Sequence, residues 1–196
     1  MSSIEIEGMI LEDLPLKDAV DMTRDLLERP GLDLVICTTE ASFFKTDISE
    51  EKKNWLELAS LNVFDVSGNE KGTFFGIFTQ HNRNMKAEDY LEFLLGYLQG
   101  TRRKVTLITE DIEHAERIRR NILREYEDID MENCVLSEFR TGDSMYNALN
   151  GSEPEAVISV LPWRLQAGIL RDARNILIAS LWVALPEESF KDKRLV

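Results

Sequence analysis

The fold of this chain is decided by residues 104–127, KVTLITEDIEHAERIRRNILREYE. The run at 104–108 is short and apolar and has the length and composition of a buried β-strand. From residue 110 on, apolar residues recur every three or four positions, which predicts a long helix with one inward face. A second strand-like run follows at 134–139. The stretch therefore predicts a strand–helix–strand unit, the crossover that joins two parallel strands.

The same alternation continues in both directions along the chain. We predict strands at 4–9, 32–37, 61–65, 156–161 and 175–185, and helices at 16–27, 50–59, 87–98, 143–150 and 165–174. Residues 68–86 are irregular and predict a loop, with a hairpin over 73–79 as an option. Alternating strands and helices build βαβ units. We therefore predict an α/β fold: a single doubly wound, mostly parallel, Rossmann-like sheet with helices on both faces, in one domain over 1–196.

The composition limits the classes of partner. The net charge of −13, from 36 acidic and 23 basic residues, opposes binding to nucleic acid, which needs cationic side chains to displace counterions. It also leaves at most peripheral contact with anionic membranes. No apolar run approaches the roughly 18 residues of a membrane span, and the N-terminal residues lack a signal-peptide pattern. Because Cys37 and Cys134 both lie in apolar runs, we expect buried free thiols and a cytoplasmic protein.

Polar side chains at the ends of predicted strands form the candidate site. Asp65 ends the run at 61–65 and could deprotonate a hydroxyl group, whereas Thr38 and Thr39 could hydrogen-bond a polar ligand. Gln166, which follows the strand at 156–161, could hold the edge of a sugar or a base. Because the carboxyl ends of parallel strands share one edge, these side chains are expected to converge where ligands bind.

The alternative interpretation is that such residues only cap helices. Thr109 and Asp111 stand directly before the long helix, in a good capping pattern. A metal site is not predicted, since His81 and His114 are the chain's only histidines and lie far apart in sequence.

Five segments, in order, resemble the motifs of one enzyme family. Residues 6–8 read Ile-Glu-Gly, 34–39 stand in place of a strand and a Thr-x-Asn turn, and 58–65 (LASLNVFD) look like an Ala-Asp-Leu-x-x-x-Asp-Gly segment. Residues 104–117 resemble the next strand and an Ala-Glu helix, and 155–166 resemble the strand before a Pro-Lys-Gln-Glu turn. In this order, from residue 4 to about 190, the chain resembles the WecG/TagA/CpsF glycosyltransferases.

The resemblance implies transfer of a hexosamine-type sugar from a UDP donor to a polyprenyl-diphosphate-linked acceptor, in the synthesis of cell wall, capsule or other surface polymers. Such enzymes invert the anomeric centre and need neither a metal ion nor another cofactor. Asp65 would be the catalytic base that activates the acceptor hydroxyl. Cys37, Thr39 and Gln166 would occupy the positions of the family's substrate-binding Thr, Asn and Gln, and Arg83 that of an arginine facing the diphosphate.

The chain also departs from the family where small or neutral residues are expected. Val66 replaces the glycine after Asp65, and Glu110 and Asp111 replace a Gly-Gly pair that opens a helix. Exposed N–H groups at a helix N-terminus attract phosphate, and two carboxylates there would occupy or repel that field. The chain ends without the basic and aromatic tail that the family uses at membranes. These departures keep a second hypothesis open: a non-catalytic homologue that acts as a binding or regulatory partner in surface glycan synthesis.

Two further options concern binding alone. The fold class by itself would also suit a small-molecule or nucleotide-binding module of unrelated function. Phe74, Phe75 and Phe78, near the irregular segment, indicate a surface for homo-oligomer formation. An equally good interpretation is that these rings cover the edge of the sheet.

Overall fold

The computed structural model of the chain describes residues 2–6, 9–39, 50–65 and 87–185. For a few residues within these segments, among them Thr39, Phe64 and Asp65, only the backbone is described. The predicted loop at 68–86 lies outside the described residues, as do the three phenylalanines assigned to an oligomer surface.

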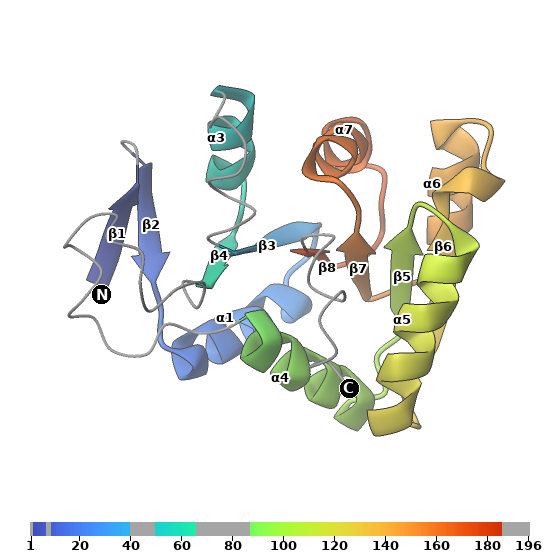
Figure 1. The fold of residues 1–196 in the computed structure, drawn as a ribbon, viewed down its shortest axis with the longest axis horizontal. Helices are drawn as coiled ribbons and strands as arrows, with labels where there is room; N and C mark the ends of the chain where they lie inside the picture. Colours follow the sequence, from blue (N-terminus) through green and yellow to red (C-terminus); the bar gives the residue numbers. More distant parts are fainter. Residues whose placement is uncertain (1, 7–8, 40–49, 66–86, 186–196) are drawn as a thin grey trace.

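The centre of the molecule is one sheet of six parallel strands in the order β4-β3-β8-β7-β5-β6 (Figure 1). The strands are β3 (Asp33–Thr39), β4 (Leu61–Asp65), β5 (Val105–Thr109), β6 (Met131–Val135), β7 (Ala156–Val160) and β8 (Leu181–Leu185). Strands β5, β7 and β8 are buried at every position, which is why their sequences are continuous apolar runs. The predicted α/β class with a doubly wound sheet is confirmed.

Helices cover both faces of this sheet (Figure 1). Helices α1 (Leu16–Glu28), α4 (Ala87–Gly100) and α5 (Ile112–Glu125) pack on one face, and α3 (Glu50–Glu57), α6 (Gly142–Gly151) and α7 (Trp163–Ala173) on the other. Successive side chains of a strand point to opposite faces of the sheet and so enter two separate hydrophobic cores. In β3, Val35 and Cys37 enter the core under α1 and α4, whereas Leu34 and Ile36 enter the core under α3 and α7.

The direction of each crossover decides which face its helix covers. The connections that run toward the β6 edge use α4 and α5, and those that run toward the β4 edge use α3, α6 and α7. All crossovers therefore have the same hand, as parallel sheets require. The helices that follow neighbouring strands lie on opposite faces at three places: between β4 and β3, between β7 and β5, and between β5 and β6. These are the topological switch points, where ligands of such sheets bind.

Three predicted elements differ from the structure. Instead of one strand over 4–9, the N-terminal residues form an antiparallel pair, β1 (Ser2–Ile6) and β2 (Met9–Asp13), in which Ile6 faces Met9. Strand β6 starts at Met131, because its edge position lets exposed Glu132 sit in a strand, and 136–138 form a 3₁₀ turn. Within 175–185, only the last five residues pair with β3 and β7 as β8.

Cys37 and Cys134 are both buried, as predicted. Strands β8, β7 and β5 separate their strands, so at about 4.8 Å per strand the two residues lie roughly 19 Å apart, beyond the reach of a disulfide. Within the described segments, no helix combines the length and apolar character needed to cross a bilayer.

The buried Cys134 thiol makes stability depend on pH in the alkaline range. Burial, with a smaller contribution from Glu138, raises the pKa of Cys134 from 9.0 to about 12. Between these values the unfolded chain loses the proton and the folded chain keeps it, so the free energy of unfolding falls as the pH rises. We expect urea titrations from pH 8 to 10.5 to show this decline, and Cys134→Ala to show a shallower one. Equal slopes in the two proteins would contradict the assignment.

Candidate functional site

The carboxyl ends of the strands lie in a row along one edge of the sheet. The last register pairs join Thr39 to Asp65, Leu185 to Val160, and Val160 to Thr109. The carboxyl ends of these strands therefore share one edge, and the convergence of the candidate side chains stays a prediction. Helices α5 and α7, which follow β5 and β7, flank the switch point between these two strands (Figure 1).

The backbone places Asp65 and Thr39 together. They form the final pair of the β3–β4 ladder, at the end of the outermost strand pair. Thr38, one residue earlier, is a buried side chain beside the backbone of Phe64. The side chains of Thr39 and Asp65 and the whole of Arg83 lie outside the described residues. Their proposed contacts with a ligand stay predictions.

Cys37 belongs to the core rather than to the surface of this edge. Its thiol is 3% exposed and packs in the layer under α1 and α4. It lies near Tyr90, a fully buried residue whose hydroxyl is 3.0 Å from Thr23 Oγ1. Burial raises the pKa of Tyr90, and the nearby Cys37 raises it further. The protein itself therefore surrounds the Cys37 side chain and leaves almost no surface for a substrate.

Gln166 is buried as well, and it joins three elements. Its Nε2 donates to the carbonyl of Leu161 at 2.7 Å and to that of Leu185 at 3.2 Å. Its Oε1 lies 3.4 Å from Nε1 of Trp182, which donates to it. The amide thus provides hydrogen-bond donors for carbonyl groups at the carboxyl ends of β7 and β8, where the hydrogen bonds between strands stop. In this arrangement both amide hydrogens bond to the protein's own backbone.

The helical periodicity of the sequence around Gln166 could have predicted that this side chain is buried. Trp163, Gln166 and Leu170 recur at spacings of three and four along α7 and so lie on one face of that helix. Trp163 and Leu170 both belong to the core on this side of the sheet. A polar residue within such a stripe points inward with its apolar neighbours, and therefore needs an internal partner.

Helices α5 and α7, which follow β5 and β7, have different N-termini. Asp111 is the N-cap of α5, and its Oδ1 accepts from the backbone N–H of His114 at 2.8 Å. Thr109 Oγ1 donates to the carbonyl of Asp111 at 2.9 Å. The capping role weighed for Thr109 and Asp111 is thus confirmed for Asp111. By contrast, Pro162 is the N-cap of α7 and offers no side-chain acceptor, so the first N–H groups of α7 carry no such cap.

Within the described part of the chain, no three His, Cys, Asp or Glu side chains gather as metal ligands. The strand-end edge carries groups capable of hydrogen bonding and of acid–base chemistry. Its polar groups are the strand-end threonines, Asp65 and the N–H groups of α7.

Removing the Gln166 amide should destabilise the fold. In Gln166→Ala the buried carbonyls of Leu161 and Leu185 and the indole N–H of Trp182 lose their partner, and we expect a loss of about 3 kcal/mol of unfolding free energy. The control is Gln99→Ala, where an exposed amide accepts from Asp128 N, with an expected loss under about 1 kcal/mol. Equal, small effects in urea unfolding would show that Gln166 has no structural role.

The Asp111 cap can be tested in the same way. Asp111→Ala should cost about 1 kcal/mol, and Asp111→Ser should recover most of it, because serine also caps. The control is Glu110→Ala, which removes an exposed carboxylate next to the cap. It should change the free energy of unfolding by less than about 0.5 kcal/mol. Thermal unfolding of the three variants distinguishes a cap from a general charge effect, which Glu110→Ala would share.

Comparison of the chain with models of known protein families finds no match, and comparison with curated proteins finds none either. The likeness to the WecG/TagA/CpsF glycosyltransferases therefore rests on the residue pattern alone. Activity, substrates and partners taken from that family are accordingly proposals.

Proposed function

We propose that this chain is a glycosyltransferase-like protein that binds a UDP-sugar at the carboxyl edge of its sheet. In the proposed reaction a hexosamine-type sugar passes, with inversion, to a polyprenyl-diphosphate-linked acceptor. Asp65 acts as the base that takes the proton of the acceptor hydroxyl. No metal ion takes part.

The observation that carries this proposal is the pairing of Thr39 with Asp65 at the end of the β3–β4 ladder. It places a carboxylate residue and a hydroxyl residue from distant segments side by side at a switch point of an all-parallel sheet. Ligands of doubly wound folds bind at such points. A base positioned beside a hydrogen-bonding residue is the minimum that acceptor activation needs.

The N-terminus of α7 supports the binding of a diphosphate. Its first N–H groups have no side-chain cap, and they open on the same edge as Asp65. Such groups, with the helix dipole behind them, suit an anionic ligand. The N-terminus of α5 is the weaker candidate, because the Asp111 carboxylate already accepts one of its N–H groups.

The hydrogen bonds that Gln166 and Asp111 make within the protein favour a second candidate function. The family's substrate-binding glutamine corresponds here to a side chain bonded to Leu161 and Leu185, and its glycine pair corresponds to Glu110 and the capping Asp111. Both features suit a non-catalytic homologue that kept the framework of the fold and serves as a binding or regulatory partner in surface glycan synthesis.

The experiment is titration with UDP and with UDP-N-acetylhexosamines, followed by NMR and calorimetry. The enzyme proposal expects binding in the millimolar range or tighter, and transfer to a polyprenyl-diphosphate-linked sugar. Asp65→Asn should keep donor binding and lose about 100-fold or more of the transfer rate, because only the base is removed. The matched control is Asp128→Asn, an exposed carboxylate away from the strand ends, which should change neither.

The outcomes separate the two candidates. Donor binding without transfer in the wild-type protein would favour the non-catalytic homologue. Absence of any binding of UDP or UDP-sugars would overturn the glycosyltransferase proposal. A transfer rate in Asp65→Asn equal to that of the wild type would remove Asp65 from the role of base.

A further inference from the structure

A groove lies between α3 and α7. Both helices cover the face of the sheet opposite α1, α4 and α5 (Figure 1). Its volume is about 550 Å³, within the range of small-molecule sites. It runs along one stripe of α7, from Arg164 near the carboxyl edge of the sheet to Arg174 and Asn175 beside the start of β3. None of the side chains assigned to the proposed glycosyl transfer lines the groove; of the first turn of α7, whose backbone N–H groups that proposal uses, only Arg164 does so.

The inner surface of this groove is apolar. Leu32, Leu34 and Leu170 lie at its base and are buried, and Trp55 of α3 forms part of the wall. Leu58, at the end of α3, is 54% exposed beside them. An apolar surface of this kind retains the body of an organic ligand through burial of its carbon atoms.

Two small residues of α7, Ala167 and Gly168, keep the groove open. A Cβ atom added at Gly168 would meet no atom within 4 Å, so no neighbouring group requires glycine there. Glycine inside a helix costs about 1 kcal/mol relative to alanine. The space over Gly168 is thus left empty at a cost in stability, as expected where a ligand needs the room.

The charged groups of the groove all have one sign. Arg164, Arg171 and Arg174 line it, and no acidic side chain of the described residues does, in a chain whose net charge is −13. At 1.5 Å per helical residue, the Cα atoms of Arg164 and Arg174 lie about 15 Å apart along the axis of α7. Arg171 makes an exposed ion pair with its neighbour Asp172. Among the described residues no ion pair engages Arg164 or Arg174.

The indole of Trp55 supplies an independent sign of an absent partner. The residue is 7% exposed, and its buried Nε1 has no hydrogen-bond partner among the described residues. Buried indole N–H groups usually find an acceptor, and leaving one unpaired costs about 1–3 kcal/mol. Because this atom is itself buried, an oxygen acceptor on a ligand in the groove would reach it only after the indole turns.

We propose that the α3–α7 groove binds a small amphipathic anion. The apolar or aromatic body of the ligand lies on the leucine base between Trp55 and Gly168, and its carboxylate or phosphate group meets the arginines of α7. This site is separate from the sugar-nucleotide site proposed above, and its test does not depend on that function.

The experiment uses two fluorescent probes with the same aromatic body. One is 1-anilinonaphthalene-8-sulfonate, an anion, and the other is N-phenyl-1-naphthylamine, which lacks the sulfonate. The wild-type protein should bind the anion at least 10-fold more tightly. Arg171→Gln together with Arg174→Gln should remove this preference, weakening the anion about 10-fold and the neutral probe less than twofold. Decanoate and decyl phosphate, used as competitors, then distinguish a carboxylate ligand from a phosphate ligand.

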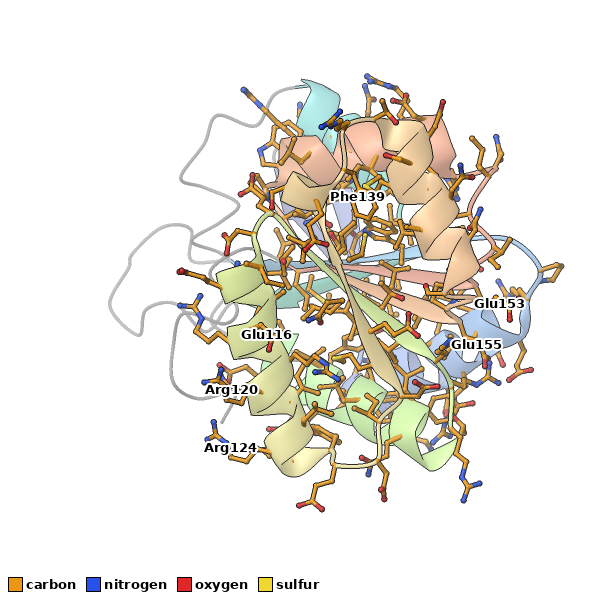
Figure 2. The ribbon with its side chains drawn as sticks, turned by 90° about the vertical axis from the view of Figure 1, so that its right-hand side faces the viewer. Glu116, Arg120, Arg124, Phe139, Glu153 and Glu155 are labelled. Atoms are coloured by element: carbon orange, nitrogen blue, oxygen red, sulfur yellow. The ribbon has the colours of Figure 1, made fainter. Side chains whose placement is uncertain are left out.

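The matched control is the pair Arg120→Gln and Arg124→Gln on the outer face of α5. These arginines lie with Glu116 along a helix on the opposite face of the sheet (Figure 2), and their loss should leave both probes unchanged. Gly168→Phe should abolish binding of both probes by filling the groove. If this variant melts more than 10 °C lower, Ala167→Leu serves the same purpose.

Three results would overturn the proposal. The first is equal affinity for the two probes in the wild-type protein. The second is a loss of anion binding in the α5 control as large as that in the groove variant. Such a loss would show that the effect depends only on the net charge of the protein. The third is unchanged probe binding in the folded variant that fills the groove.

Discussion

Burial of a parallel sheet on both faces is the constraint on which the rest of this structure depends. Strands β5, β7 and β8 have no exposed residue, so their backbone polar groups can be satisfied only by neighbouring strands. Parallel neighbours require long crossovers, and these place helices on both faces. The carboxyl ends of all strands consequently meet at one edge, where the ladder stops and other partners must take over.

The groups at that edge fall into two kinds. One kind is satisfied internally: Gln166 bonds the carbonyls of Leu161 and Leu185, and Asp111 caps α5. The other kind lacks such a partner: the first N–H groups of α7 have no side-chain cap. A polar residue at a strand end is therefore not equivalent to a binding residue. Its hydrogen bonds decide which of the two kinds it belongs to.

The sequence predicted the parts of the fold that depend on local pattern. The strand at 61–65 and the helix over 87–98 appear with nearly the predicted bounds, because their periodicity and turn residues are strong. The capping role of Asp111 was also readable, since a cap involves only residues three apart. The antiparallel partner β2 and the early start of β6 were missed, because pairing overrode weak local preferences there.

By itself, the sequence determined the alternation of strands and helices, the inward face of each helix and the candidate residues at the strand ends. Only the tertiary structure decided the strand order, the enclosure of Cys37, and the bonds of Gln166 to a carbonyl 19 residues away. The same holds for the groove, which assembles residues near 32, 55 and 170. The physical reason is that local pattern reflects the conformational preference of a segment. The partner of a buried polar group instead depends on which distant segments the whole core brings together.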